Sequence, residues 1–147
     1  MILIDALYAF IGSFSFGVLF NIKGKNLLFC SLISSITWII FQALSTDDLS
    51  LPAYLISAFV AGILSEIFAI ILKYPVLTFN LCGIISLVPG NRIYFAMNFF
   101  INNDIPSAAN GIFEALCIAG AISIGVLFAS SLITITKSFK RVIKIKK

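Results

Sequence analysis

"LVPGNRIYFAMNFF", residues 87–100, interrupts an apolar run of membrane length with Pro89, Gly90 and the charged Arg92. Proline lacks a backbone donor, and its ring disfavours helical geometry at the residue before it. Glycine adds the backbone freedom for a turn, and Asn91 is the predicted N-cap of a second half-helix. The stretch therefore predicts a transmembrane helix that is broken along its length.

The composition of the whole chain indicates a membrane protein. Of its 147 residues, 61% are hydrophobic and 11% are charged, and the mean hydropathy is +1.12. A soluble domain of this length has too little interior to bury so much apolar surface. We therefore predict an all-α integral membrane protein, a bundle of about five transmembrane helices with the fourth broken at Pro89-Gly90.

A membrane-crossing helix needs about 20 predominantly apolar residues. The predicted spans are residues 2–20, 27–44, 51–72, 76–101 and 108–135. They form a transmembrane domain of residues 1–136, which is followed by a basic cytoplasmic tail of residues 137–147. Because the connections are short, neighbouring spans should pack antiparallel.

Charges at the span ends and in the connections sort to opposite faces. The basic ones are Lys23, Lys25, Lys73 and those of the tail. The acidic ones are Asp5, Asp47, Asp48 and Asp104. Because basic residues accumulate on the cytoplasmic side of membrane proteins, we predict that the N-terminus lies outside and the C-terminus lies in the cytoplasm.

Three charged residues fall within spans instead, namely Arg92, Glu66 and Glu114. Each costs about 2.5–3.5 kcal/mol on insertion and needs a partner or water. Arg92 and Glu114 each lie about 12 Å from the outer face at 1.5 Å per residue, so they can pair. Glu66 shares a helical face with Ala58 and Gly62, whose small side chains admit another helix, so its carboxylate should point into the bundle. These charges either hold helices together or mark a hydrated, proton-titrating path.

The broken span also predicts a ligand. Exposed backbone at membrane depth needs cover from protein or from a water-filled cavity, and the N-terminus of a half-helix beside Arg92 favours a carboxylate. The alternative is a proline kink without a ligand, since Pro and Gly are common in transmembrane helices. The residues predicted to form the substrate pathway are Pro89, Gly90, Asn91, Arg92, Tyr94, Glu66, Glu114, Asn110 and Asn80.

The sequence lacks the residue patterns of most enzymes and metal sites. It has no histidine and no GxSxG or HExxH motif. Cys30, Cys82 and Cys117 lie in separate apolar runs without CxxC spacing, so they are expected to be small packing residues. We therefore expect no enzyme activity, no cofactor and no metal, and the basic residues at span ends indicate lipid headgroups instead of nucleic acid as their partner.

Three stretches carry a resemblance to a known family: "FGVLFNIKGKNLLFCSLISSITW" (16–38), "ISAFVAGILSEIFAIILKYPVLTFNLCGIISLVPGNRIYFAM" (56–97) and "CIAGAISIGVLFASSL" (117–132). Their most specific features are Phe20-Asn21, Pro75, Pro89-Gly90 followed by Tyr94, and "AISIG" at 121–125. With these features in this order, the chain resembles the small membrane subunit, of the YjjB type, of the split threonine/serine exporter (ThrE-like) family.

The resemblance implies a subunit of a secondary transporter in the bacterial cytoplasmic membrane. It would export small carboxylate-bearing metabolites, either threonine/serine-type amino acids or dicarboxylates such as succinate, together with a larger ThrE-like membrane subunit. A partner is also expected on physical grounds, because an alternating-access path is often built from two related repeats and one set of spans is visible here. The larger subunit or a homo-oligomer would supply the remaining wall. The alternative is a structural or assembly subunit without direct substrate contact.

Overall fold

The computed structural model describes residues 2–45 and 50–145, with side chains as far as Thr136. Its elements are α1 (Ile2–Leu19), α2 (Lys25–Leu44), α3 (Leu51–Leu72), α4 (Val76–Ile84), the 3-10 helix η1 (Ile85–Leu87), α5 (Gly90–Ile101) and α6 (Ile105–Ile145). Every regular element in these ranges is helical, which confirms the predicted all-α class. Asp47, Asp48 and the side chains of the basic tail lie outside the described residues.

The helices have the length and composition of membrane spans. α1, α2, α3 and the segment Ile105–Thr136 of α6 are each long and apolar enough to cross a membrane. The segments Val76–Leu87 and Gly90–Ile101 qualify together as one more span, bent by 55°. The helices follow the predicted ranges closely, except that α6 continues without interruption through the predicted tail to Ile145. The chain is thus a multi-pass membrane protein.

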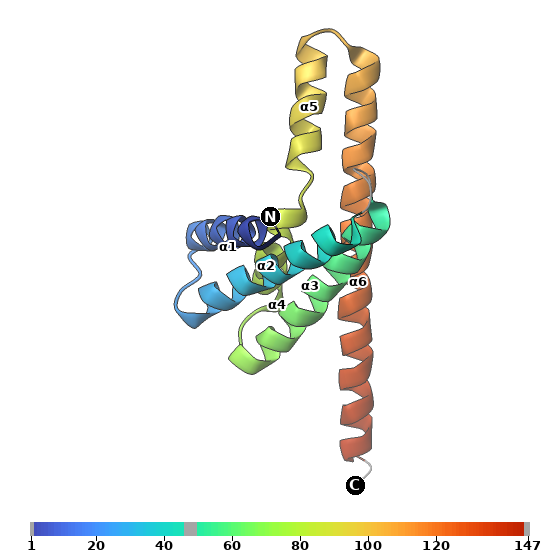
Figure 1. Cartoon of the computed structure of the whole chain (residues 1–147). Coiled ribbons are helices and arrows are strands. Elements are labelled where there is room, and N and C mark those ends of the chain that lie inside the picture. The colour runs from blue at the N-terminus through green and yellow to red at the C-terminus, as the bar shows by residue number, and fades with distance from the viewer. Residues whose placement is uncertain (1, 46–49, 146–147) are drawn as a thin grey trace.

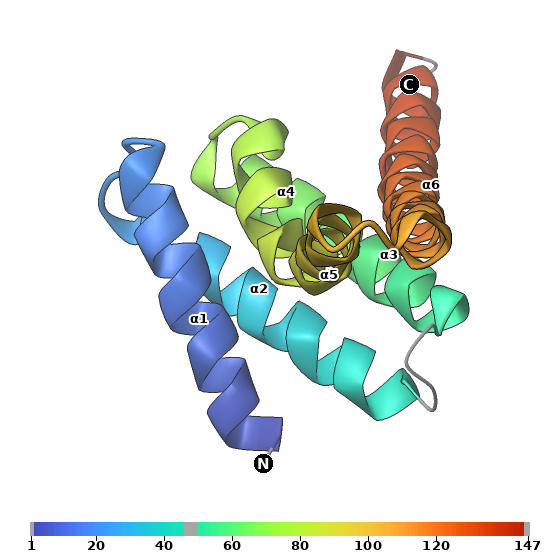
Figure 2. The ribbon, with the colours of Figure 1, turned by 90° about the horizontal axis from the view of Figure 1, so that it is seen from above.

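The helices form two units. α1 to α4 make one bundle, and α5 with the first half of α6 makes a hairpin that projects from it (Figure 1). Viewed from above, α5 is seen end-on while α1 to α4 lie across the view (Figure 2). α2 contacts α1, α3 and α4 and so stands at the centre of the bundle. The break after η1 lies where the two units meet.

The turns between paired helices share one backbone conformation. Asn21, Lys73 and Asn103 have left-handed backbone angles, with φ of 57°, 52° and 60°. After each, the next amide reaches back to the last helical turn; Asp104 N–H, for example, bonds the Phe99 carbonyl at 3.0 Å. This arrangement satisfies carbonyls that a helix end leaves open and reverses the chain within a few residues. It explains why α1 and α2, α3 and α4, and α5 and α6 pair as short-loop hairpins.

Glycines bring α3 and α6 into backbone contact. A Cβ at Gly62 would lie 2.6 Å from the Cβ of Ala129, and a Cβ at Gly125 would lie 2.5 Å from the carbonyl oxygen of Leu55. The predicted small-residue face of α3 is therefore confirmed, and α6 is the helix that packs on it. Glu66, one turn beyond Gly62, is buried with 7% of its surface exposed, as predicted for a carboxylate that points into the bundle.

Hydroxyl groups link the bundle helices and anchor the break. Ser13 Oγ donates to the Cys82 carbonyl at 2.9 Å, which joins α1 to α4. Ser34 Oγ donates to Ser86 Oγ at 3.1 Å, which joins α2 to η1. Such bonds between transmembrane helices contribute about 0.6 kcal/mol on average. The segment just before the break is therefore held by α2, and α5 starts from a fixed point.

Candidate functional site

At the break between η1 and α5, backbone groups form hydrogen bonds with one another. Val88 N–H bonds the Ile85 carbonyl at 3.4 Å, and Gly90 N–H bonds the Val88 carbonyl at 2.7 Å. Pro89 between them has φ −77° and ψ 53°, close to an inverse γ-turn. α5 then begins at once, with Ile93 N–H on the Pro89 carbonyl at 3.2 Å. The chain therefore changes direction within two residues, and the predicted break of the fourth span is confirmed.

The predicted role of Asn91 as an N-cap is wrong. α5 begins at Gly90, so Pro89 occupies the N-cap position, and no side chain caps this helix end. The reason is that the tight turn at Pro89 already brings the chain into helical geometry at the next residue, which leaves Asn91 inside the first turn. The Asn91 side chain is instead exposed and lines a cleft.

A cleft of about 690 Å³ lies against the break. One wall is aromatic: the Trp38 and Phe41 rings lie 5.4 Å apart, and the Phe41 and Tyr54 rings lie 4.4 Å apart. The lining residues are Trp38, Phe41 and Ser45 from the α2 side, Tyr54 from α3, and Ser86, Leu87, Val88, Pro89, Asn91, Arg92 and Phe95 from the broken span. We call this space the break cleft. The broken span contributes Ser86, Asn91 and Arg92 as polar lining residues, and the α2 side contributes Ser45.

Arg92 and Glu114 form the ion pair that the sequence predicted. Arg92 Nη1 lies 2.8 Å from Glu114 Oε2, and each side chain keeps 32% of its surface exposed. Pairs this exposed contribute at most about 1 kcal/mol to stability. Both residues border a second cleft of about 380 Å³ between α5 and α6, which we call the hairpin cleft and which also includes Asn110 and Ser107. Arg92 lines both clefts, so this residue connects them.

Four of the nine predicted pathway residues do not reach these clefts. The Tyr94 side chain is 66% exposed and turns toward the Phe95 ring at a centroid distance of 5.6 Å. Gly90 faces open space. Glu66 and Asn80 are buried in α3 and α4 within the bundle. The other five, Pro89, Asn91, Arg92, Asn110 and Glu114, line the break cleft or the hairpin cleft.

Three lining residues of the break cleft were missed by sequence reasoning. Trp38, Tyr54 and Ser86 line the break cleft, yet their role depends on which helices stand beside the break. The sequence held one signal: Trp38 is the only tryptophan of the chain, and an indole in a transmembrane helix brings an N–H that needs a partner. In the structure the Trp38 Nε1 atom is buried and makes no hydrogen bond.

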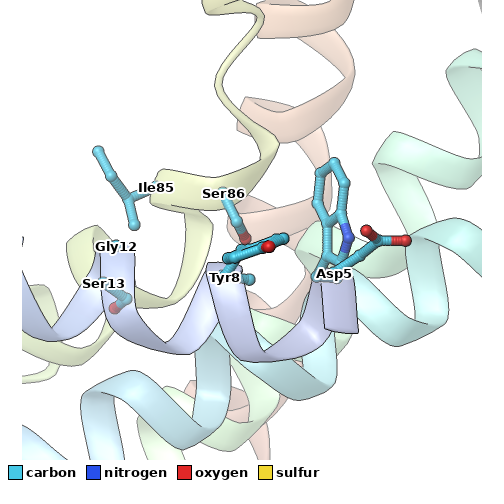
Figure 3. A pocket seen from close by; sticks show the side chains of 8 residues that line it. Asp5, Tyr8, Gly12, Ser13, Ile85 and Ser86 are labelled. Atoms are coloured by element: carbon cyan, nitrogen blue, oxygen red, sulfur yellow. The ribbon is translucent and has the colours of Figure 1, made fainter. Parts of the chain in front are cut away.

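A third cleft of about 360 Å³ runs along α1 and shares Trp38 and Ser86 with the break cleft. We call it the α1 cleft. Figure 3 shows the Tyr8 and Ser86 side chains next to one another in it, with the Asp5 carboxylate at one end. Asp5 Oδ2 accepts a hydrogen bond of 2.7 Å from Gln42 Nε2. The three clefts therefore follow one another from α1 across the break to α6.

The chemistry of the site is that of binding. Within residues 2–45 and 50–145, no group of three or more Cys, Asp or Glu side chains is arranged to hold a metal ion. A guanidinium, aromatic rings, hydroxyls and amides can instead hold and release a small polar solute. A model of the threonine/serine exporter family, ThrE, matches residues 5–132. The chain belongs to the threonine/serine exporter family.

Membership of the exporter family places the chain among transporters. No curated protein and no solved structure matches the chain. The matched residues run from Asp5 to Leu132 and so include all three clefts and the ion pair. The family match and the clefts at the broken span therefore concern the same part of the molecule.

Proposed function

We propose that this chain forms the carboxylate-binding part of an export path for threonine/serine-type amino acids, and that Arg92 receives the carboxylate. The observation that supports this most is that Arg92 lines both the break cleft and the hairpin cleft. Arginine is suited to carboxylates because its planar N–H groups match both oxygens. The N-terminus of α5 adds a partial positive charge of the same sign beside it.

The break is central to this proposal because it makes room for water and solute at membrane depth. Non-helical backbone there is tolerated where it borders a water-filled space. The turn at Pro89 leaves the break cleft beside a helix start, as in transporters that bind solutes at discontinuous helices. The solute would meet Asn91 and Arg92 on one side and the rings of Tyr54 and Trp38 on the other.

The charges of the clefts favour amino acids over dicarboxylates. Among the described residues that line the three clefts, Arg92 is the one cation. A zwitterionic amino acid needs one cationic partner for its carboxylate, and aromatic faces such as Tyr54 and Trp38 can attract its ammonium group. A dicarboxylate such as succinate would need a second cation, which a partner subunit would have to supply.

A partner is part of the proposal because the hairpin leaves a large apolar surface exposed beside the clefts. The hairpin exposes large apolar side chains, with Tyr94 at 66%, Phe100 at 58% and Phe113 at 67%. We propose that a larger ThrE-like subunit, or a second copy of this chain, closes the path there. In this arrangement the chain would sit in the bacterial cytoplasmic membrane with its N-terminus outside. A reporter fused after Lys147 that is active only outside the cell would contradict this orientation.

The second candidate is a structural subunit that makes no substrate contact. The Arg92–Glu114 pair and the glycine contacts of α3 with α6 support it, because both serve to hold helices together. The two candidates differ in one respect. Only the export path requires Arg92 and Asn91 to be reachable by substrate.

Transport in proteoliposomes separates the candidates. The chain, with its partner, is reconstituted and the exchange of labelled for unlabelled threonine is followed. We expect Arg92→Gln to abolish exchange and Arg92→Lys to retain part of it, because lysine keeps the charge without the fork of donors. Full exchange in well-assembled Arg92→Gln protein would support the structural candidate. Competition by unlabelled serine but not by succinate is expected if amino acids are the substrates.

Cysteine labelling provides the matched control. In a background where Cys30, Cys82 and Cys117 are replaced by alanine, a cysteine at position 91 should be labelled by a water-soluble reagent and protected by threonine. A cysteine at position 94 serves as the comparison, because Tyr94 is 66% exposed and does not line the break cleft. Equal protection at both positions, or none at position 91, would count against the proposed path.

A further inference from the structure

We propose that Asp5 is a proton-binding carboxylate and that the α1 cleft couples its protonation to the occupancy of the break cleft. The proposal rests on the exporter function proposed above, in which a secondary transporter draws on an ion gradient. It concerns a site on α1 that lies apart from the Arg92–Glu114 pair.

The side chain that holds Asp5 can hold it in either protonation state. Gln42 Nε2 donates to Asp5 Oδ2 at 2.7 Å, which suits an ionised carboxylate. The other end of the amide, Gln42 Oε1, is buried and makes no hydrogen bond. Turning the amide by half a revolution would place this oxygen against Asp5, where it can accept a hydrogen bond from the protonated carboxyl group. This rotation of the Gln42 amide breaks no hydrogen bond of Oε1, because Oε1 makes none.

Other carboxylates of the described chain are engaged differently. Glu114 is paired with the Arg92 guanidinium at 2.8 Å. Asp104 accepts a hydrogen bond from the Ser107 backbone at 3.2 Å and caps α6. Glu66 is buried in α3 and lines none of the three clefts. Asp5 is the carboxylate that combines a neutral partner with access from a cleft.

The surroundings of Asp5 contain few charges. α1 contributes Tyr8 as the other titratable side chain that lines the α1 cleft. α2 contributes Trp38 and the neutral amide of Gln42, and η1 contributes Ile85 and the Ser86 hydroxyl. Among these described residues no cation opposes protonation of Asp5.

Two shared side chains connect Asp5 with the proposed substrate site. Trp38 and Ser86 line both the α1 cleft and the break cleft. Ser86 also accepts the hydrogen bond from Ser34 that fixes η1 to α2. A change in charge at Asp5 therefore acts on groups that a solute beside Arg92 also touches. In one cycle, a proton would leave hydronium on one side of the membrane, form an O–H bond on Asp5, and return to water on the other side.

The single tryptophan gives a readout that does not depend on transport. Trp38 is the only indole of the chain, and neutralising a carboxylate in the same cleft alters its emission. The full chain in phospholipid vesicles is titrated with acid over the range in which carboxyl groups titrate. We expect one transition in Trp38 fluorescence, which Asp5→Asn abolishes and Asp104→Asn preserves. A transition that persists in Asp5→Asn, or none in the unaltered chain, would overturn the proposal.

Gln42 provides a second variant in case Asp5→Asn assembles poorly. Gln42→Leu removes the amide that donates to Asp5, so the midpoint of the fluorescence transition should change while the chain keeps Asp5. An unchanged midpoint would mean that the Gln42 amide does not govern the proton, against the proposal. Asp5→Glu is expected to retain a transition, since it keeps a carboxyl group on α1.

Transport distinguishes the failure of this proposal from the failure of the exporter function. Asp5→Asn should retain threonine exchange without a gradient and lose accumulation driven by a pH gradient. Two results with Asp5→Asn would contradict the proton site and leave the exporter function standing: gradient-driven accumulation that persists, or loss of exchange together with accumulation. Accumulation driven by a sodium gradient in the unaltered chain would do the same. If the unaltered chain shows no exchange at all, the exporter function fails, and the fluorescence transition still decides whether Asp5 binds a proton.

Discussion

The two halves of α6 pack in opposite ways. Its second half meets α3 through Gly125, where a Cβ would lie 2.5 Å from a backbone oxygen. Its first half meets α5 through Gly111 and Ala96, and beyond them through the Arg92–Glu114 pair, which is a third exposed, and the hairpin cleft. One helix thus carries a closely packed interface and a more open one. The first holds the fold together, and the second holds the groups that we propose act in export.

This contrast follows from what each interface buries. The α3 side of α6 includes Ile118 and Ala129, which are fully buried, whereas α5 buries only Ala96 among its described residues. Packing without voids or water leaves little freedom to rearrange. A hairpin attached mainly at its base can change position with less loss of contact, as gating elements of transporters must. Four substitutions test the contrast.

The largest effect is expected from Gly125→Leu. The added side chain would displace the Leu55 backbone, and overpacking of this kind costs about 1–3 kcal/mol or more. We expect loss of most monodisperse protein in detergent and a large drop in melting temperature. Gly120→Leu is the matched control on the same helix, because a Cβ at Gly120 meets nothing within 4 Å. Equal losses in both variants would refute the claim that the α3 interface holds the fold.

Pro89→Ala should straighten the broken span and abolish export. Alanine restores the backbone donor and removes a helix penalty of about 3 kcal/mol, so α4 and α5 can join into one helix and close the break cleft. Spin labels at the exposed positions 77 and 97, on either side of the break, should move apart in distance measurements because the 55° bend decreases. Pro75→Ala, at the start of α4, is the control and should leave the distance unchanged. Identical distances in Pro89→Ala would show that other contacts maintain the bend.

Exchanging the charges of the ion pair separates its structural part from its part in transport. Arg92→Glu alone places two carboxylates together and should lower the melting temperature. The loss in the free energy of unfolding should be no more than about 1 kcal/mol, because the pair is a third exposed. Arg92→Glu with Glu114→Arg should restore the melting temperature. It should not restore threonine exchange, because position 114 does not line the break cleft. If exchange recovers as well, the pair matters only as an ion pair.

Features that depend on local sequence could be predicted, and features that depend on neighbouring helices could not. Pro89 fixed the place of the break, and helical rise alone brought Arg92 and Glu114 to the same depth. Tyr94 was predicted as a pathway residue together with Arg92, but it lines none of the three clefts, because residues two apart on a helix point to different sides. Trp38 entered the site only through the packing of α2 beside η1, which no pattern in the sequence specifies.

The smallest effect is expected at the tip of the hairpin. Asp104→Ala removes the cap of α6 and should cost about 1 kcal/mol, because the Ser107 amide loses its acceptor. Asn103→Gly is the control, since glycine takes the left-handed angle at this position without the penalty of a Cβ. Hydrogen exchange should accelerate at the first amides of α6 in Asp104→Ala and stay slow where α6 packs on α3. Faster exchange along the whole helix would mean that the two halves of α6 are one cooperative unit, and the distinction between a rigid crossing and an adjustable hairpin would have to be abandoned.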